Sequence, residues 1–277
     1  MARRNTWSEA AWILGFAGLS LLMLVPLLFM LSTSLKYEQD VYEYPIRLIP
    51  ASATFEHYVD LFTRPGVPML RWFFNSAYTT FMVTGLVLLI DSLTAFGFSR
   101  LDIPYKRPLF MLVIASMMIP FPTTLIPVYV FLQQLHWIDT YKALIIPPLA
   151  APFGVFLLRQ FFDTAPKELE EAAIIDGCSA FGVYWHVILP VSKSVMATLG
   201  IFVFMGTWNA FLWPLIVTHS LKMRPIPVGL TLFNGEFWAE RALTMAGATV
   251  CALPVLIAFL IFQRHIVRGI TLTGLKA

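Results

Sequence analysis

Uncharged apolar stretches alternate with short polar segments along the whole chain. The stretches cover residues 10–35, 72–90, 108–138, 143–158, 194–221 and 242–263. Each is near or above the ~20 residues that an α-helix needs to cross a hydrocarbon core of roughly 30 Å. The pattern predicts an all-α polytopic membrane protein in which residues 1–277 form a single transmembrane domain. The six expected transmembrane helices lie at about 12–34, 73–98, 109–132, 142–160, 194–217 and 243–263.

Composition supports a membrane location. Charged residues make up 13% of the chain and apolar residues 58%, whereas charged residues make up roughly 25% of an average soluble domain. Arg3 and Arg4, before the first apolar run, resemble the start of a cleaved secretion signal. That run lasts 26 residues and no small-residue cleavage site follows a short helix in it. We therefore expect it to be a retained anchor.

The distribution of Lys and Arg predicts the orientation of the chain. An even number of spans places both termini on one side, and that side holds 11 of the 19 basic residues. Because cytoplasmic loops carry the excess of Lys and Arg, we expect both termini in the cytoplasm and the spans in the cell (inner or plasma) membrane. Two longer loops, 36–71 and 218–241, then face outward. They either meet a partner that arrives from outside or connect and cover the helices.

The third apolar run contains three prolines within eight residues, Pro120, Pro122 and Pro127. Each removes a backbone donor and presses against the preceding helical turn. In lipid, the freed carbonyl groups need a neighbouring helix or a water-lined cavity, and interrupted helices line the paths of many transporters. Membrane helices also tolerate proline without such a role. A place on a substrate path is thus one of two open interpretations of this run.

The cytoplasmic loop over residues 161–192 is patterned more strongly than a connector requires. Asp163-Thr164-Ala165-Pro166 offers capping side chains and a proline near the first helical position. Glu168, Glu170 and Glu171 follow in the opening turns, where carboxylates complement the positive end of the helix dipole. The segment predicts a short helix that begins near Pro166.

This expected helix carries small and acidic residues on one face. Leu169, Ala172, Ala173 and Asp176 recur at helical spacing, and Gly177 permits the conformation that ends a helix. A second apolar stripe then predicts another short helix, at Phe181, Tyr184, Trp185 and Ile188. The pair is either a docking element for a partner or an amphipathic hairpin on the inner leaflet, with its aromatic side chains among the lipid headgroups.

The run Glu171-Ala-Ala-Ile-Ile-Asp176-Gly177 resembles the EAA loop of ABC-importer permeases, in which a glycine follows EAA and a Leu-Pro pair lies further on. Leu189 and Pro190 supply that pair, beginning twelve residues after Gly177. Further segments extend the resemblance to the MalG-like carbohydrate permeases, a subfamily of the binding-protein-dependent transport inner-membrane components: Phe156–Phe162, Pro166–Glu170, Trp208–Leu215 and Phe262–Ile270. Two positions depart from the pattern, because Cys178 stands where a small alanine is usual and His186 where an arginine is common.

The resemblance implies that this loop is a coupling helix, which inserts into a cleft on a separate ATPase subunit. The ATPase-coupling positions would be Glu171, Ala172, Ala173, Asp176, Gly177, Leu189 and Pro190. The implied partners are a second, MalF-like permease subunit, two ATPase subunits and an extracellular or periplasmic substrate-binding protein. The chain would be a transport subunit without a cofactor of its own, since ATP and Mg²⁺ bind the partner ATPase. The implied substrate is a sugar, an oligosaccharide or a related polyol derivative such as glycerol-3-phosphate or a glycerophosphodiester.

Asp91 is an acidic residue within the second apolar segment. A carboxylate within a membrane helix costs roughly 2.5 to 3.5 kcal/mol at the centre on insertion scales, so it usually faces protein or a cavity. Asp91 either binds substrate or a proton, or it pairs near the interface with Arg100 or with the other permease subunit.

Trp208, Asn209 and Trp213 lie close together in the fifth apolar segment. An amide between aromatic rings suits sugar binding by stacking and hydrogen bonding. Asn in a membrane helix also bonds neighbouring helices, so both interpretations stay open. The candidate substrate path therefore comprises Asp91, Pro120, Pro122, Trp208, Asn209 and Trp213.

The sequence contains no motif for ATP binding or covalent catalysis. G-x-x-x-x-G-K-[ST], G-x-S-x-G and H-E-x-x-H are all missing. Neither Cys178 nor Cys251 has a second Cys or His at metal-ligand spacing, and no basic patch with interleaved aromatics indicates nucleic acid. Two rival classes are a secondary transporter or channel with Asp91 as its ion site and a membrane-embedded enzyme, but the EAA loop favours neither.

Overall fold

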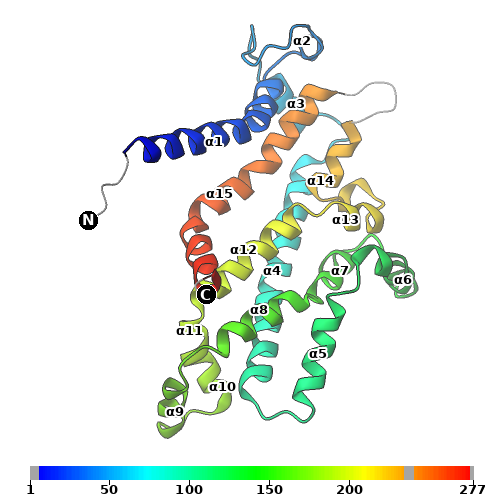
Figure 1. Ribbon diagram of the computed structural model, residues 1–277. Helices are drawn as coiled ribbons and strands as arrows, with labels where there is room; N and C mark the ends of the chain where they lie inside the picture. The colour runs from blue at the N-terminus through cyan, green and yellow to red at the C-terminus, as the bar shows by residue number, and fades with distance from the viewer. Residues whose placement is uncertain (1–5, 234–239, 275–277) are drawn as a thin grey trace. The chain divides into compact units, whose positions relative to one another are not determined.

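The computed structural model describes residues 6–233 and 240–274, and every regular element among them is helical (Figure 1). The all-α prediction is thereby confirmed. The chain divides into two compact units. The first comprises Met1–Met69 with Leu230–Leu253, and the second comprises Leu70–Gly229 with Pro254–Ala277.

Several helices are suited by length and composition to cross a membrane. Three are long and apolar enough on their own, at Trp12–Ser34, Met69–Arg100 and Arg241–Ile261. Three more candidates are bent pairs, at Lys106–Ser116 with Phe121–Gln134, Tyr141–Leu149 with Pro152–Phe162, and Ala180–Val191 with Lys193–Trp208. The described residues thus hold three spans, or up to six if each bent pair is one span. The count of six stays a prediction.

In the first unit, Glu38, the first residue of a short helix, caps a helix that begins about two hundred residues later. The unit contains α1 (Thr6–Ser34), α2 (Glu38–Val41), α3 (Glu56–Thr63), the 3₁₀ turn η4 (Leu230–Phe233) and the first part of α15 (Arg241–Gly274). The Glu38 carboxylate accepts hydrogen bonds from the backbone N–H groups of Arg241 at 2.8 Å and Ala242 at 2.9 Å. These groups have no partner within the helix, and the negative charge suits the helix N-terminus.

A second set of polar contacts, from Arg64, joins this part of the first unit to the residue before α15. Arg64 donates two hydrogen bonds to the carboxylate of Glu240, one of them from Nη2 at 2.9 Å, and its Nε lies 3.2 Å from Asp60. Because Glu240 directly precedes α15, the segment that holds α2 and α3 and the start of α15 form one hydrogen-bonded assembly.

The second unit is organised around the long helix α4 (Met69–Arg100). Its other elements are α5 (Lys106–Ser116), α6 (Phe121–Gln134), α7 (Tyr141–Ile145), η1 (Pro147–Leu149), α8 (Pro152–Phe162), α9 (Lys167–Ile175), α10 (Ala180–Val183), η2 (Tyr184–Ile188), α11 (Leu189–Val191), α12 (Lys193–Trp208), α13 (Leu212–Val217), η3 (Leu221–Met223) and α14 (Ile226–Gly229). The main apolar core joins α4, α8 and α12 through Ala95, Leu158, Phe162 and Leu199.

The segment between α13 and α14 is bound closely to α4. Trp72 donates from Nε1 to the carbonyl of Leu221 at 2.7 Å. The fully buried Asn75 donates to the carbonyls of Lys222 and Arg224 at 2.8 and 3.0 Å, and its Oδ1 accepts a hydrogen bond from Tyr141 at 2.6 Å. This part of the expected outward loop 218–241 therefore covers the helices, which was one of the two interpretations; residues 234–239 of the loop lie outside the described residues.

Proline interrupts the third and fourth expected spans. Residues 109–132 divide into α5 and α6, which are bent by 97°, and residues 142–160 bend by 40° between Leu149 and Pro152. Pro120 precedes α6 in an extended conformation and Pro122 lies in its first turn, where the missing N–H has no intrahelical acceptor. The prolines thus mark helix starts after a break.

The expectation of one continuous helix over residues 194–217 was wrong. α12 ends at Trp208 and α13 begins at Leu212. The Asn209 side chain donates to the carbonyl of Met205 at 2.9 Å, so it supplies a hydrogen-bond donor to a carbonyl group in the last turn of α12. Pro214 cannot continue the helix, because its ring would press on the preceding turn and it lacks an N–H.

Candidate functional site

The helix α9 rests on a largely buried ion pair. Arg100, the last residue of α4, donates from Nε to Glu170 at 2.5 Å, and the two side chains are only 10% and 11% exposed. Arg100 also donates from Nη2 to the carbonyls of Phe162 at 2.6 Å and Ala165 at 3.3 Å. The end of α4 therefore binds both α9 and the segment that leads into it.

The outer face of α9 is exposed and mixes acidic, small and apolar groups. Glu171, Ala172 and Asp176 are exposed, and Ile174 and Ile175 are 60% and 85% exposed. The four-residue spacing of Glu171 and Ile175 places these two on one stripe of the helix. Ile174 and Ile175 thus give α9 exposed apolar side chains next to its carboxylates.

The opposite side of α9 is anchored in the core. Ala173 is half-buried and packs against the cluster that contains Phe162 and Tyr184. Gly177 follows the helix with a φ of +85°, and the backbone N–H of Cys178 bonds to the carbonyl of Ala173 at 2.9 Å. Gly177 therefore ends α9 in the left-handed conformation that glycine adopts without strain.

The expected capping of α9 by Asp163 and Thr164 was wrong. The residue before the helix is Pro166, and no side chain caps it. Asp163 instead follows α8 and accepts a hydrogen bond from Ser99 at 2.6 Å. The nearby Arg100 and Arg159 attract this carboxylate towards the end of α8.

The second apolar stripe of the loop has two faces in the structure. Tyr184 and Ile188 are each 1% exposed and belong to the core, and the Tyr184 hydroxyl lies 2.8 Å from that of Ser92. Phe181 and Trp185 remain 64% and 54% exposed. This half of the loop is therefore both an anchor and an exposed aromatic surface.

Leu189 and Pro190 lie in α11, next to a bend of 79° between residues 180–191 and α12. Leu189 packs against the same core cluster as Tyr184. The Leu-Pro pair thus marks the junction between the loop over residues 161–192 and a membrane-spanning candidate.

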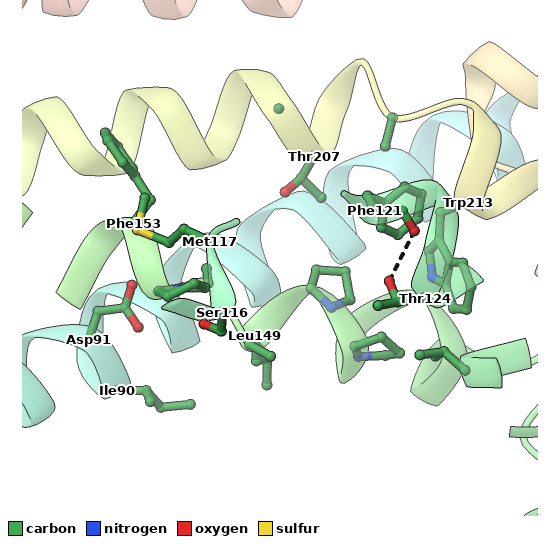
Figure 2. A pocket seen from close by; sticks show the side chains of 18 of the residues that line it. Ile90, Asp91, Ser116, Met117, Phe121, Thr124, Leu149, Phe153, Thr207 and Trp213 are labelled. Atoms are coloured by element: carbon green, nitrogen blue, oxygen red, sulfur yellow. Dashed lines mark hydrogen bonds between the residues drawn. The ribbon is translucent and has the colours of Figure 1, made fainter. Parts of the chain in front are cut away.

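A cavity of about 950 Å³ lies within the second unit, bordered by α4, α5, α6, α8 and α12 (Figure 2). Asp91 lines one end, near Ser116 and Met117, and Trp213 lines the other, near Phe121 and Thr124. A volume near the upper end of the ~300–1,000 Å³ that is typical of small-molecule sites makes this the candidate for a substrate path.

Asp91 is 2% exposed, and its Oδ2 has no hydrogen-bond partner among the residues that the structure describes. The suggested pairing with Arg100 does not form, since Arg100 binds Glu170. A Cβ added at Gly154 would overlap the Asp91 carboxylate. The glycine on α8 therefore allows α8 to approach the carboxylate on α4 closely.

Of the other candidate path residues, one lines the cavity and four do not. Trp213 lines the cavity, and its Nε1 donates to the carbonyl of Ala143 at 2.9 Å. Trp208 is buried and stacks on Phe204, with ring centroids 5.9 Å apart. Pro120, Pro122, Trp208 and Asn209 are not among the residues that line the cavity. Of the predicted path residues, only Asp91 and Trp213 line the cavity, and they lie at its opposite ends.

Sequence reasoning missed the residues that complete this site. Gly154 and the lining hydroxyl residues were not predicted to belong to a site. Glu170 was interpreted only as a favourable negative charge near the start of a helix. A glycine within an apolar run was the available signal for a close helix contact. Which carboxylate it faces depends on contacts between distant segments.

The sequence of this chain is similar to those of known transport proteins. Residues 92–272 match the family described as "Binding-protein-dependent transport system inner membrane component". The arabinooligosaccharide transport system permease protein AraQ of Halalkalibacterium halodurans is 32% identical over 99% of each chain. The sulfoquinovosyl glycerol transport system permease protein SmoH of Agrobacterium fabrum is 34% identical over 91% of this chain and 89% of its own. The trehalose/maltose permease protein MalG of Thermococcus litoralis is 29% identical over 99% of each.

A solved structure shares the fold. It is a chain of a bacterial ABC transporter involved in the import of the acidic polysaccharide alginate, with a TM-score of 0.82, 20% identity and coverage of 95% of this chain and 98% of that one. The family match and the full-length relatives show that this chain belongs to the binding-protein-dependent transport system inner-membrane components, as an ABC-importer permease of the MalG-like sugar-transport group.

Proposed function

We propose that this chain is a permease subunit of an ATP-driven importer that carries a sugar, an oligosaccharide or a related polyol derivative across the cell membrane. Its expected partners are a second, MalF-like permease subunit, two ATPase subunits that bind ATP and Mg²⁺, and an external substrate-binding protein. Both termini face the cytoplasm in this proposal. The relatives support it, since their names include permeases for arabino-oligosaccharides, sulfoquinovosyl glycerol and trehalose or maltose.

The observation that carries the coupling role is the contrast between the two sides of α9. Its outer side exposes Glu171, Ile174 and Ile175, whereas its inner side is held by the Arg100–Glu170 pair and by Ala173 in the core. A docking helix must be accessible to its partner, and it must also be rigidly joined to the spans that it moves. α9 meets both requirements.

The proposed cycle is alternating access. ATP binding brings the two ATPase subunits together, and α9 moves with the ATPase to which it is docked. The force passes through Arg100 to α4, and through Tyr184 and Leu189 to the bend before α12. The breaks in the helices are places where segments can reorient, since a few terminal residues absorb such changes.

The outer loop of the first unit supplies a candidate contact for the binding protein. Tyr44, Ile46 and Ile49 are 90%, 64% and 83% exposed on the segment between α2 and α3. Apolar side chains gathered on an exposed loop favour a contact with another protein. The hydrogen bonds of Glu38 and Arg64 hold the ends of this loop.

A charge reversal on α9 tests the coupling role. In the complete complex reconstituted in liposomes, Glu171→Lys should abolish ATP-driven uptake and stimulation of ATP hydrolysis while the subunit still inserts in the membrane. Asp102→Lys is the matched control, because Asp102 is an exposed aspartate in the loop between α4 and α5, outside α9. Normal uptake by Glu171→Lys would contradict the coupling role.

The source of energy has its own test. The purified chain alone should hydrolyse no ATP, and uptake should require the ATPase subunits. Substrate movement by this chain without them would instead favour a secondary transporter or channel that uses Asp91.

A further inference from the structure

The cavity in the second unit has an unusual polar lining. Among the described residues that border it, there is one carboxylate, Asp91, and no Lys, Arg or His. The remaining polar side chains, apart from the Trp213 indole, are five hydroxyl groups, at Thr79, Thr94, Ser116, Thr124 and Thr207. A ligand in this cavity therefore meets no positively charged side chain of this subunit.

Four of these hydroxyl groups already donate their protons to their own helices. Thr79 donates to the carbonyl of Asn75 at 2.7 Å, and Thr94 to that of Ile90 at 2.7 Å. Ser116 donates to Val113 at 2.7 Å, and Thr124 donates to Phe121 at 2.9 Å (Figure 2). Since a hydroxyl has one proton and two lone pairs, what these groups still offer to a ligand is an acceptor oxygen.

The indole N–H among the lining side chains also donates to a backbone carbonyl. The indole N–H of Trp213 donates to the backbone carbonyl of Ala143 at 2.9 Å, so Trp213 offers the cavity its aromatic surface. At the other end, Oδ2 of Asp91 is buried and accepts no hydrogen bond from any described residue. Apart from the Thr207 hydroxyl, the side chains that line the cavity thus offer a ligand acceptors and not donors.

Such a lining discriminates between classes of substrate. The hydroxyl groups of an uncharged saccharide can donate to these oxygens, and its apolar ring face can stack on an aromatic side chain. A phosphate, sulfonate or carboxylate group offers acceptors only and requires donors or cations around it. Burying that group beside Asp91, without a positive charge, is unfavourable because an unpaired charge loses its hydration.

We propose that this cavity is a binding site for an uncharged saccharide on the translocation path, with Asp91 accepting a hydrogen bond from a sugar hydroxyl. The inference rests on the proposed importer function and narrows its substrate class. It excludes glycerol-3-phosphate, glycerophosphodiesters, sulfonated sugars and uronic acids. Gly154 has a positioning role, since it lets α8 close over the Asp91 carboxylate.

Uptake by the complete complex in liposomes, with its binding protein, tests the substrate class. The uncharged probes are arabinotriose, lactose and maltotriose, and the anionic probes are trigalacturonate, sulfoquinovosyl glycerol and glycerol-3-phosphate. We expect ATP-dependent accumulation of at least one uncharged probe and of no anionic probe. Accumulation of an anionic probe overturns this inference and leaves the importer function standing, whereas accumulation of none of the six overturns both.

Variants of Asp91 test its contact with substrate. Asp91→Leu should lower the uptake rate of the transported probe about tenfold, since a hydrogen bond to a charged group is lost, while the complex still assembles and its binding protein still stimulates ATP hydrolysis. Asp91→Asn, which keeps an acceptor oxygen, should retain most of the uptake. If Asp91→Asn prevents co-purification of the partner permease, Asp91 pairs with that subunit and the inference falls. Unchanged uptake by Asp91→Leu also overturns it.

Discussion

Arg100 at the end of α4 and Glu170 in the first turn of α9 form a hydrogen-bonded ion pair, with Nε and Oε1 2.5 Å apart and both side chains about nine-tenths buried. The pair joins the longest helix of the second unit to the loop that we propose as the coupling element. The same guanidinium binds the carbonyls of Phe162, the last residue of α8, and of Ala165, which lies just before α9. The end of α4 is therefore hydrogen-bonded both to α9 and to the segment that leads into it.

Removing one partner of this pair should destabilise the protein. Arg100→Ala leaves the Glu170 carboxylate buried without its counter-charge, a change that typically costs about 3–5 kcal/mol. We expect a lower thermal unfolding temperature of the purified chain and weaker coupling of ATP hydrolysis to uptake. Arg107→Ala, at an exposed arginine of α5, serves as the control and should change neither. An unfolding temperature equal to that of the wild type would show that the pair does not hold α9.

Gly177 should be sensitive to substitution because of its backbone conformation. Its φ is +85°, and a Cβ at this position would meet no atom within 4 Å. The cost of Gly177→Val is therefore conformational, on the order of 1–2 kcal/mol or more for a side chain in the left-handed region. We expect loss of coupled transport, measured as uptake per ATP hydrolysed.

Gly66 offers a matched control for Gly177. It has a φ of +84° and open space around the position of a Cβ, but it lies in the outer loop. Gly66→Val should lower thermal stability similarly and leave the ratio of uptake to ATP hydrolysis unchanged. Equal loss of coupling in both variants would attribute the effect to stability alone.

Gly154→Ala should be destabilising for a steric reason. The new Cβ would overlap the Asp91 carboxylate and lie 3.0 Å from Cδ2 of Leu199, and overpacking of this kind typically costs about 1–3 kcal/mol. Gly85→Ala is the control on α4, because nothing lies within 4 Å of its Cβ position; the helix propensity of alanine should make it neutral or slightly stabilising. Thermal unfolding of both variants measures the difference, and equal temperatures would contradict the close contact.

Asp139 should make stability depend on pH in the acid range. Burial raises the pKa of its carboxyl group, but hydrogen bonds from Ser220 and His219 outweigh this effect and leave the pKa below its usual value. A lowered pKa in the folded state means that the stabilisation is complete above the unfolded value of about 3.9 and is lost as the pH falls through the folded pKa.

The measurement for Asp139 is thermal unfolding of the detergent-purified protein between pH 6 and pH 3. Asp139→Asn keeps an acceptor oxygen and tolerates the positive φ of +59° at this position, but it cannot titrate. Its unfolding temperature should fall less steeply below about pH 4 than that of the wild type. Asp102→Asn controls for the loss of one carboxylate. If the unfolding temperature of Asp139→Asn falls with pH as steeply as that of the wild type, Asp139 does not cause the pH dependence.

Much of the local structure could be predicted from sequence. Uninterrupted apolar runs indicate helices, and the all-α class follows from them. Gly177 was expected to end a helix and does so, because a single residue's conformational freedom is a local property. Prolines within the apolar runs indicate local kinks, but the positions and angles of the helix breaks at Asn209 and near Ala150 could not be predicted. Apolar composition alone does not distinguish one span from two short helices joined at an angle.

The membrane-protein class, the helical periodicity and the EAA-like loop could be read from local sequence, since each depends on residues close together in the chain. The packing of distant segments shows that Arg100 binds Glu170 and not Asp91, that Gly154 admits the Asp91 carboxylate, and that Trp213 borders the cavity while Trp208 does not. These contacts join segments tens of residues apart. They depend on how the helices pack, and the order of residues along one helix does not reveal which neighbour it meets.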